Sequence, residues 1–229
     1  MVDTSLIRIA AELASAAICI ILMKFMIKPY QLTKESRYLG LPLGFGLLGL
    51  SFVISAIVYI LGKPTTYNID LFWFQSLMKV FAFAFLAVTY NFSNKPLQKA
   101  RFLPEIAFGL LIAIFVALFL ITVAFPKVAS QDYTESQVFI RILNTVFLTY
   151  VAAQALKSHI KKPDPTTIWI PIGFGLLAVS QYSSIFWYTD LSLASYFGEI
   201  IIRLVGLSIF LIVSYRTFYS SGNVKEEGS

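Results

Sequence analysis

Residues 106–125 read IAFGLLIAIFVALFLITVAF, a run in which Thr122 carries the only hydrogen-bonding side chain. A helix of about 20 mostly apolar residues is long enough to cross the hydrocarbon core of a bilayer. Six further segments, on both sides of this run, have the same character. The expected spans are 5–27, 39–62, 70–92, 102–125, 135–157, 167–188 and 192–217. We therefore predict an all-α membrane protein, a bundle of seven transmembrane helices with the lipid bilayer as its main partner.

The composition supports this class and excludes several functions. Only 13% of the 229 residues are charged and 58% are hydrophobic, whereas a soluble domain carries about 25% charged residues. The single cysteine, Cys19, is expected to be a small buried hydrophobic residue. With one cysteine and one histidine, His159, a metal site built from several such ligands is not expected, nor is a haem held by two histidines. We expect no cofactor.

The basic residues indicate the orientation in the membrane. Twelve of them lie in or beside the loops of one side, and only Lys63 and Lys127 lie in those of the other. The twelve are Lys24, Lys28, Lys34, Arg37, Lys95, Lys99, Arg101, Lys157, Lys161, Lys162, Arg216 and Lys225. Because basic loops stay in the cytoplasm, we expect the N-terminus outside and the C-terminus in the cytoplasm of a multi-pass cell-membrane protein. The net charge of +6 then reflects topology, and nucleic acid is not expected as a partner.

Two halves of the chain share a pattern that suggests an internal repeat. PLGFGLL at 42–48 matches PIGFGLL at 171–177. Three more pairs occur in the same order: Gln75 and Lys79 with Glu199 and Arg203, Arg8-Ile9 with Arg141-Ile142, and Lys28-Pro29 with Lys162-Pro163. We predict a 3+1+3 parallel repeat within one domain, 1–219. Repeat one covers about 5–92, the linker helix about 102–125 and repeat two about 135–217; a short polar tail, 220–229, follows.

Glycines in and just before the shared phrase are expected to let helices pack closely near the cytoplasmic side. They are Gly40, Gly44, Gly46, Gly173 and Gly175.

Ionisable residues inside the spans form the candidate site. Lys79 lies about nine residues into its span and Arg203 about eleven, so both approach the bilayer midplane. A charge there costs about 2.5–3.5 kcal/mol on insertion scales. Other polar residues, including Ser51, lie at similar depth in the extracellular half of six helices. The candidate ligand-binding residues are Arg8, Glu12, Ser55, Tyr59, Gln75, Lys79, Arg141, Asn144, Gln181, Ser184, Tyr188, Glu199 and Arg203.

This cluster has two interpretations. Glu12 and Glu199 can neutralise two of the four cations in a network that only holds helices together. Alternatively, the remaining positive charge belongs to a cavity for a small or amphipathic anion, such as a free carboxylate or an anionic lipid headgroup. The second interpretation predicts a sensor or receptor-like protein. Its competitors are a small-solute transporter, with proton coupling through Glu12 or Glu199 as one option, and an accessory subunit of a membrane complex. An enzyme is not expected, because no paired membrane aspartates, Ser-His pair or metal-ligand set is present.

The expected topology resembles that of microbial rhodopsins, and the 3+1+3 plan resembles sugar transporters of the SWEET type. The seventh span carries Arg203 where a rhodopsin has its retinal-binding lysine, and arginine cannot form that linkage. The paired Pro-Gln signature of the SWEET-type transporters is missing. The likeness is one of architecture, which does not establish function.

Overall fold

The computed structural model of the chain describes residues 4–61, 66–93, 102–124, 133–190 and 192–220, and the regular structure in this part is helical. The α-helices are α1 (Thr4–Thr33), α2 (Gly40–Ile60), α3 (Thr66–Ser93), α4 (Leu103–Ala124), α5 (Tyr133–Lys161), α6 (Trp169–Asp190) and α7 (Leu193–Tyr215). A short 3-10 helix, η1 (Ser36–Tyr38), precedes α2, and a π-helical turn, η4 (Arg216–Ser220), follows α7. Seven helical segments in this part are long and apolar enough to cross a membrane. The predicted seven-helix membrane bundle is confirmed at this level.

Three helices extend at least four residues beyond the spans predicted for them, and α3 begins at Thr66 instead of 70. α1 continues past residue 27, through Pro29, to Thr33, and α5 continues past residue 157 to Lys161. Hydropathy defines only the stretch that lipid can cover, whereas backbone hydrogen bonds continue the helix into water. A proline removes one backbone donor, and the Thr33 hydroxyl closes the last turn of α1 by donating to the Pro29 carbonyl at 2.8 Å. The predicted tail begins inside η4, and its residues after Ser220 lie outside the described residues.

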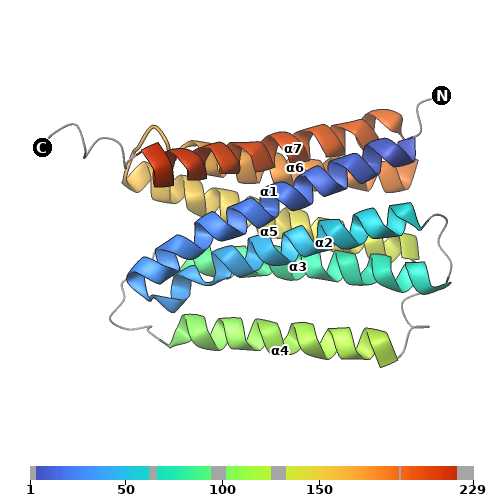
Figure 1. Cartoon of the computed structure of the whole chain (residues 1–229), viewed down its shortest axis with the longest axis horizontal. Helices are drawn as coiled ribbons and strands as arrows, with labels where there is room; N and C mark the ends of the chain where they lie inside the picture. The colour runs from blue at the N-terminus through green and yellow to red at the C-terminus, as the bar shows by residue number, and fades with distance from the viewer. Residues whose placement is uncertain (1–3, 62–65, 94–101, 125–132, 191, 221–229) are drawn as a thin grey trace, which may run out of the picture.

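Six helices pack in a ring. Neighbours in sequence pack together from α1 to α3 and from α5 to α7, and contacts of α3 with α5 and of α1 with α7 close the ring. α4 lies along one side of the bundle, where it packs on α3 (Figure 1). The helices therefore alternate in direction, and both segments of three begin at the same end as the N-terminus.

Exposed apolar side chains are most frequent on α4. Most of its large side chains are exposed, as in Ile106, Leu110 and Leu120. Its attachment to α3 is aromatic. Ring centroids lie 5.8 Å apart for Phe85 and Phe108, 5.1 Å for Phe81 and Phe115, and 4.9 Å for Phe74 and Phe119.

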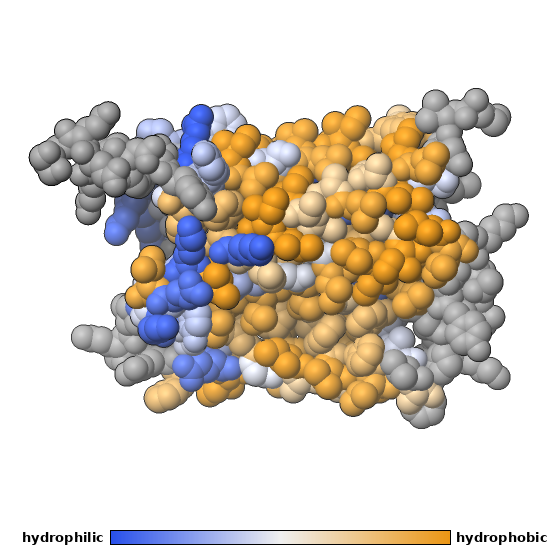
Figure 2. Space-filling view, viewed as in Figure 1, coloured by the Kyte–Doolittle hydropathy of each residue, from blue (hydrophilic) through white to orange (hydrophobic). Residues whose placement is uncertain are grey.

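The two ends of the bundle differ in charge. Hydrophilic residues gather at the end where the chain terminates, and a hydrophobic band covers the middle (Figure 2). We call the former the basic end, after Lys24, Lys28, Arg37, Lys161 and Arg216. The opposite end, where α1 begins, is called the N-terminal end.

Close contact between helices near the basic end depends on glycine. This expectation holds for four of the five glycines named from the sequence. A Cβ on Gly44 of α2 would lie 2.8 Å from Leu86 of α3, and one on Gly173 of α6 would lie 2.8 Å from Phe210 of α7. At Gly40 and Gly46 an added Cβ would also meet a neighbour at under 3.0 Å. The expectation is wrong for Gly175, because nothing lies within 4 Å of the place where its Cβ would be.

Candidate functional site

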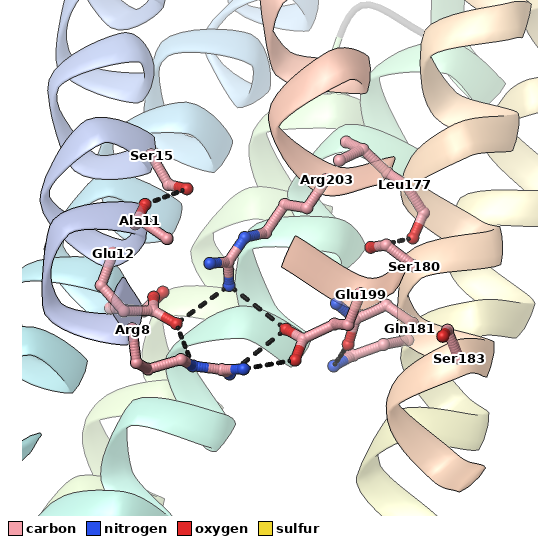
Figure 3. Close-up of polar contacts among 12 residues, drawn as sticks. Arg8, Ala11, Glu12, Ser15, Leu177, Ser180, Gln181, Ser183, Glu199 and Arg203 are labelled. Carbon is pink, nitrogen blue, oxygen red and sulfur yellow. Dashed lines mark hydrogen bonds and ion pairs between the residues drawn. The ribbon is translucent and has the colours of Figure 1, made fainter. Parts of the chain in front are cut away.

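Two arginines and two glutamates join α1 to α7 in the half of the bundle nearer the N-terminal end (Figure 3). Arg8 and Glu12 lie four residues apart on α1, as do Glu199 and Arg203 on α7, so each pair shares one helix face. Arg8 forms a two-pronged contact with Glu199, at 2.6 Å from Nη1 to Oε2 and 3.3 Å from Nη2 to Oε1. Its Nε lies 3.0 Å from Glu12 Oε1.

Arg203 completes this network. Its Nη1 donates to Glu12 Oε1 at 3.1 Å and to Glu199 Oε1 at 3.3 Å. Each carboxylate therefore bridges both guanidinium groups, and all four side chains are at most 6% exposed. Two positive and two negative charges cancel here. Glu12 and Glu199 thus pair with two of the four buried cations at the α1–α7 interface, which is the pairing that the first interpretation of the cluster describes.

Aromatic rings surround the same cations. The Arg8 guanidinium carbon lies 5.6 Å from the centroid of the Tyr59 ring and 5.4 Å from that of Tyr196. Phe52 contacts two cations at once, since its centroid lies 4.9 Å from Lys79 Nζ and 4.7 Å from the Arg203 guanidinium carbon. A ring face attracts a desolvated cation by about 2 kcal/mol. These rings make the burial of the charges less costly.

The α3–α5 interface, on another side of the ring, has a different composition. The buried polar side chains of these two helices include Gln75, Ser76 and Lys79 of α3 and Gln137, Arg141 and Asn144 of α5. Ser76 Oγ donates to Gln137 Oε1 at 2.9 Å, and Asn144 Nδ2 donates to Gln181 Oε1 of α6 at 3.4 Å. These two helices carry positive charge and neutral polar groups. The two buried acids among the described residues lie elsewhere, Glu12 on α1 and Glu199 on α7.

The buried charges do not balance. Among the described residues, the buried ionisable side chains with a formal charge at pH 7 are Arg8, Glu12, Lys79, Arg141, Glu199 and Arg203. Four are positive and two are negative, which leaves a net formal charge of +2. Within the described part of the chain no hydrogen bond or ion pair joins Lys79 to another residue; Glu12, Glu199, Arg141 and Arg203 act on its charge through space.

Several polar atoms around this surplus have no hydrogen-bond partner among the described residues. They include Arg203 Nε and Nη2, Asn144 Oδ1 and Ser184 Oγ, all buried. A buried polar atom left unsatisfied costs about 1–3 kcal/mol. Arg203 and Ser184 can therefore offer donors, and Asn144 Oδ1 an acceptor, to an additional group without loss of the ion pairs that the cluster already makes.

The structure places most of the predicted site residues in or next to this cluster. Arg8, Glu12, Tyr59, Lys79, Glu199 and Arg203 are brought together, and Asn144 joins Gln181. Ser55, Gln75 and Ser184 are buried. Ser51 instead donates to the Leu48 carbonyl of its own helix at 2.7 Å. Tyr188 lies in α6, and its side chain is outside the described residues.

Sequence reasoning missed four participants. Tyr196 lies three residues before Glu199 and seven before Arg203, so helical spacing could have assigned it to the same face. Ser76 follows the candidate residue Gln75 directly, and Gln137 lies four residues before Arg141, so their positions beside candidate residues could have indicated them. Phe52 is one of 21 phenylalanines, and no feature of the sequence distinguishes it from the others.

No protein-family model, curated protein or solved structure shows significant similarity to the chain. Within the described ranges, no three His, Cys, Asp or Glu side chains gather in a way that could hold a metal ion.

Proposed function

We propose that this protein is a receptor-like membrane protein that binds a small or amphipathic anion in the buried cluster. The observation that carries the proposal is the buried ammonium group of Lys79, which no hydrogen bond or ion pair joins to another residue in the described part of the chain, in a cluster whose described buried charges sum to +2. Uncompensated charge inside a membrane protein is costly and marks functional sites. A bound carboxylate or phosphate group would offset it.

The chemistry around Lys79 favours an oxyanion. Ammonium and guanidinium groups bind carboxylate and phosphate groups through charge-assisted hydrogen bonds. The neutral neighbours are amides and a hydroxyl, from Gln75, Asn144, Gln181 and Ser184, which can donate to the remaining oxygen atoms. The ligand headgroup is therefore a carboxylate or a phosphate-like group of one or two negative charges. Glu12 and Glu199 are already paired and hold the cations in place.

The proposed orientation places this site in the extracellular half. The basic end would be cytoplasmic, because basic residues predominate in the segments that lie there, and the cell membrane is the proposed location. Between the cluster and the basic end the ring is filled by apolar side chains such as Leu48, Leu86 and Leu207. Such a packed floor suits recognition from outside better than passage through the protein.

The proposal also includes the internal repeat. If Arg203 corresponds to Lys79, then Gly206 corresponds to Ala82 and Phe210 to Leu86. The glycine contacts follow the same scheme: a Cβ on Gly44 would lie 3.0 Å from the Ala82 carbonyl oxygen, and a Cβ on Gly206 would lie 3.1 Å from the Gly173 carbonyl oxygen. The α3–α5 and α7–α1 contacts would be equivalent in such a repeat.

The direct test removes the surplus charge. Purified protein in nanodiscs is heated with increasing sodium acetate, phosphate or octanoate, at an ionic strength held constant with sodium chloride. We expect at least one anion to raise the unfolding temperature of the wild type in a saturable way, and Lys79→Met to abolish this effect. Lys24→Met, which removes the same charge from an exposed position, should retain it. An unchanged anion effect in Lys79→Met would refute the proposed site.

The equivalence of the two three-helix units favours a transporter as the second candidate, since parallel repeats are common in transporters. Proteoliposomes loaded with unlabelled acetate or phosphate separate the two functions. A transporter accumulates the labelled anion by counterflow, whereas a receptor binds it without flux. An accessory subunit of a membrane complex would instead be recognised by native mass measurement in mild detergent, which would give the mass of a hetero-oligomer.

A further inference from the structure

A second feature lies at the opposite end of the ring from the charge cluster. A cavity of about 190 Å³ lies near the basic end, between α1, α2, α3, α6, α7 and η4. Its walls include Met26, Phe45, Tyr90, Phe174 and Phe210. None of the residues of the charge cluster lines it, so an occupant of this cavity would not depend on the proposed anion site.

One buried hydroxyl group in the wall is without a partner. Ser214 of α7 is 2% exposed, and its Oγ has no hydrogen-bond partner among the described residues. Other hydroxyl groups of the bundle close onto their own helices: Thr89 donates to the Phe85 carbonyl at 2.9 Å and Thr145 to the Arg141 carbonyl at 2.8 Å. Ser214 lines the cavity instead. An unsatisfied hydroxyl in such a position can bond to a bound molecule.

The backbone beside Ser214 is also irregular. α7 ends at Tyr215 and passes into the π-helical turn η4, from which Thr217 and Phe218 contribute to the wall. π-helical turns are rare and occur frequently at functional sites. The unpartnered hydroxyl and the irregular turn therefore coincide at one cavity.

The rest of the wall determines the kind of occupant. Four aromatic rings of the wall contact one another. The Phe174 centroid lies 4.5 Å from that of Phe210 and 5.4 Å from that of Tyr90, and the Phe210 centroid lies 5.8 Å from that of Phe45. No charged side chain is among the described wall residues. A charged molecule would leave its charge unpaired here, at a high cost. An apolar cavity of about 150 Å³ is known to hold benzene, so the space fits one aromatic ring.

We propose that this cavity is a binding site for a small, uncharged aromatic molecule with one hydroxyl or amine group, which Ser214 recognises by a hydrogen bond. The aromatic walls bind the ring, and the hydroxyl group of Ser214 distinguishes such a molecule from a purely apolar one of equal size. Phenols are the simplest members of this class.

The test compares 4-fluorophenol with fluorobenzene by fluorine NMR on the full chain in nanodiscs. Both probes should give a saturable bound signal with the wild type, with tighter binding of 4-fluorophenol. Ser214→Ala should weaken 4-fluorophenol about three- to ten-fold, the worth of one hydrogen bond, and leave fluorobenzene within about two-fold. Ser214→Leu, which fills the cavity, should abolish both signals.

The matched control is Ser180→Ala. It removes a buried hydroxyl group that already donates to the Leu177 carbonyl at 2.9 Å, and it should not change the binding of either probe. The site is refuted if the wild type gives no saturable signal, or if Ser214→Leu, shown to be folded by its thermal unfolding transition, binds both probes as the wild type does. Recognition by the hydroxyl group is refuted if Ser214→Ala weakens neither probe or both equally.

Discussion

The α1–α7 and α3–α5 interfaces both hold buried polar residues but treat charge differently. At α1–α7, Glu199 precedes Arg203 by four residues, and the two arginines are matched by two carboxylates. At α3–α5, Gln75 precedes Lys79 by four residues, and an amide stands where the other side has an acid. The comparison teaches that buried cations of one helix bundle can be neutralised by carboxylates at one interface and remain in excess of buried acids at another.

The physical consequence differs in the same way. A buried charge whose partner is removed destabilises a protein strongly, whereas a complete network is close to neutral. The α1–α7 interface is therefore expected to determine stability. The α3–α5 interface is expected to determine affinity for an added anion. Four experiments test this comparison, in order of decreasing expected effect.

Glu199→Gln should have the largest effect, because it leaves Arg8 and Arg203 with one carboxylate between them. We expect a loss of about 3–5 kcal/mol in the free energy of unfolding, measured as a lower thermal midpoint in detergent. Glu105→Gln is the control, since Glu105 is exposed and only accepts a hydrogen bond from Ser36.

We attribute the destabilisation by Glu199→Gln to the excess positive charge that it leaves, and not to the loss of one side chain. The double variant Arg8→Gln with Glu199→Gln removes one charge of each sign and should be more stable than Glu199→Gln alone. Equal midpoints for Glu199→Gln and Glu105→Gln would show that the network does not stabilise the fold.

The next test concerns the equivalence of the two three-helix units on which the comparison depends. Gly44→Ala and Gly173→Ala should each lose about 1–3 kcal/mol in the free energy of unfolding, because the added methyl group would lie 2.8 Å from a neighbouring side chain in both cases. Gly175→Ala has open space and should gain up to about 1 kcal/mol from helix propensity. If only one of Gly44→Ala and Gly173→Ala is destabilising in thermal unfolding, the proposed equivalence loses its support.

Gln75→Glu should convert the α3–α5 interface into a copy of the other. The new carboxylate lies one helical turn before Lys79, as Glu199 does before Arg203. We expect the free energy of unfolding without added anion to rise by about 1–2 kcal/mol and stabilisation by anions to shrink. Thermal unfolding with and without acetate or phosphate measures both.

Gln75→Leu provides the uncharged control for that variant and should reduce stabilisation by anions less than Gln75→Glu does. The interpretation of a charge surplus fails if Gln75→Glu is as destabilising as Glu199→Gln.

Ser76→Ala should have the smallest effect, because it removes one neutral hydrogen bond at the α3–α5 interface, to Gln137 at 2.9 Å. Hydrogen bonds between membrane helices contribute about 0.6 kcal/mol on average, and a loss of this size is expected in the unfolding free energy. Ser180→Ala, whose hydroxyl group bonds within its own helix, should lose less. Equal losses would mean that the Ser76–Gln137 hydrogen bond contributes nothing to the α3–α5 contact.

Much of the site could be predicted from the sequence because charge in lipid is rare. Lys79 and Arg203 are conspicuous inside apolar spans, and the four-residue spacing of Glu199 and Arg203 places them on one helix face. The pairing of Arg8 with Glu199 could not be predicted, because these residues are 191 positions apart. Phe52 could not be distinguished from other phenylalanines, since its role depends on which cations reach its ring.

The sequence by itself determined the seven membrane-spanning helices, since the length and hydropathy of a segment decide whether lipid can cover it. It also determined which side chains would be costly to bury. Only the tertiary structure decided which charges meet: α1 packs on α7 and α3 on α5, so both described buried acids gather at one interface. The reason is physical. Hydropathy acts locally along a helix, whereas the cancellation of a buried charge depends on distances of a few ångströms between helices far apart in the chain.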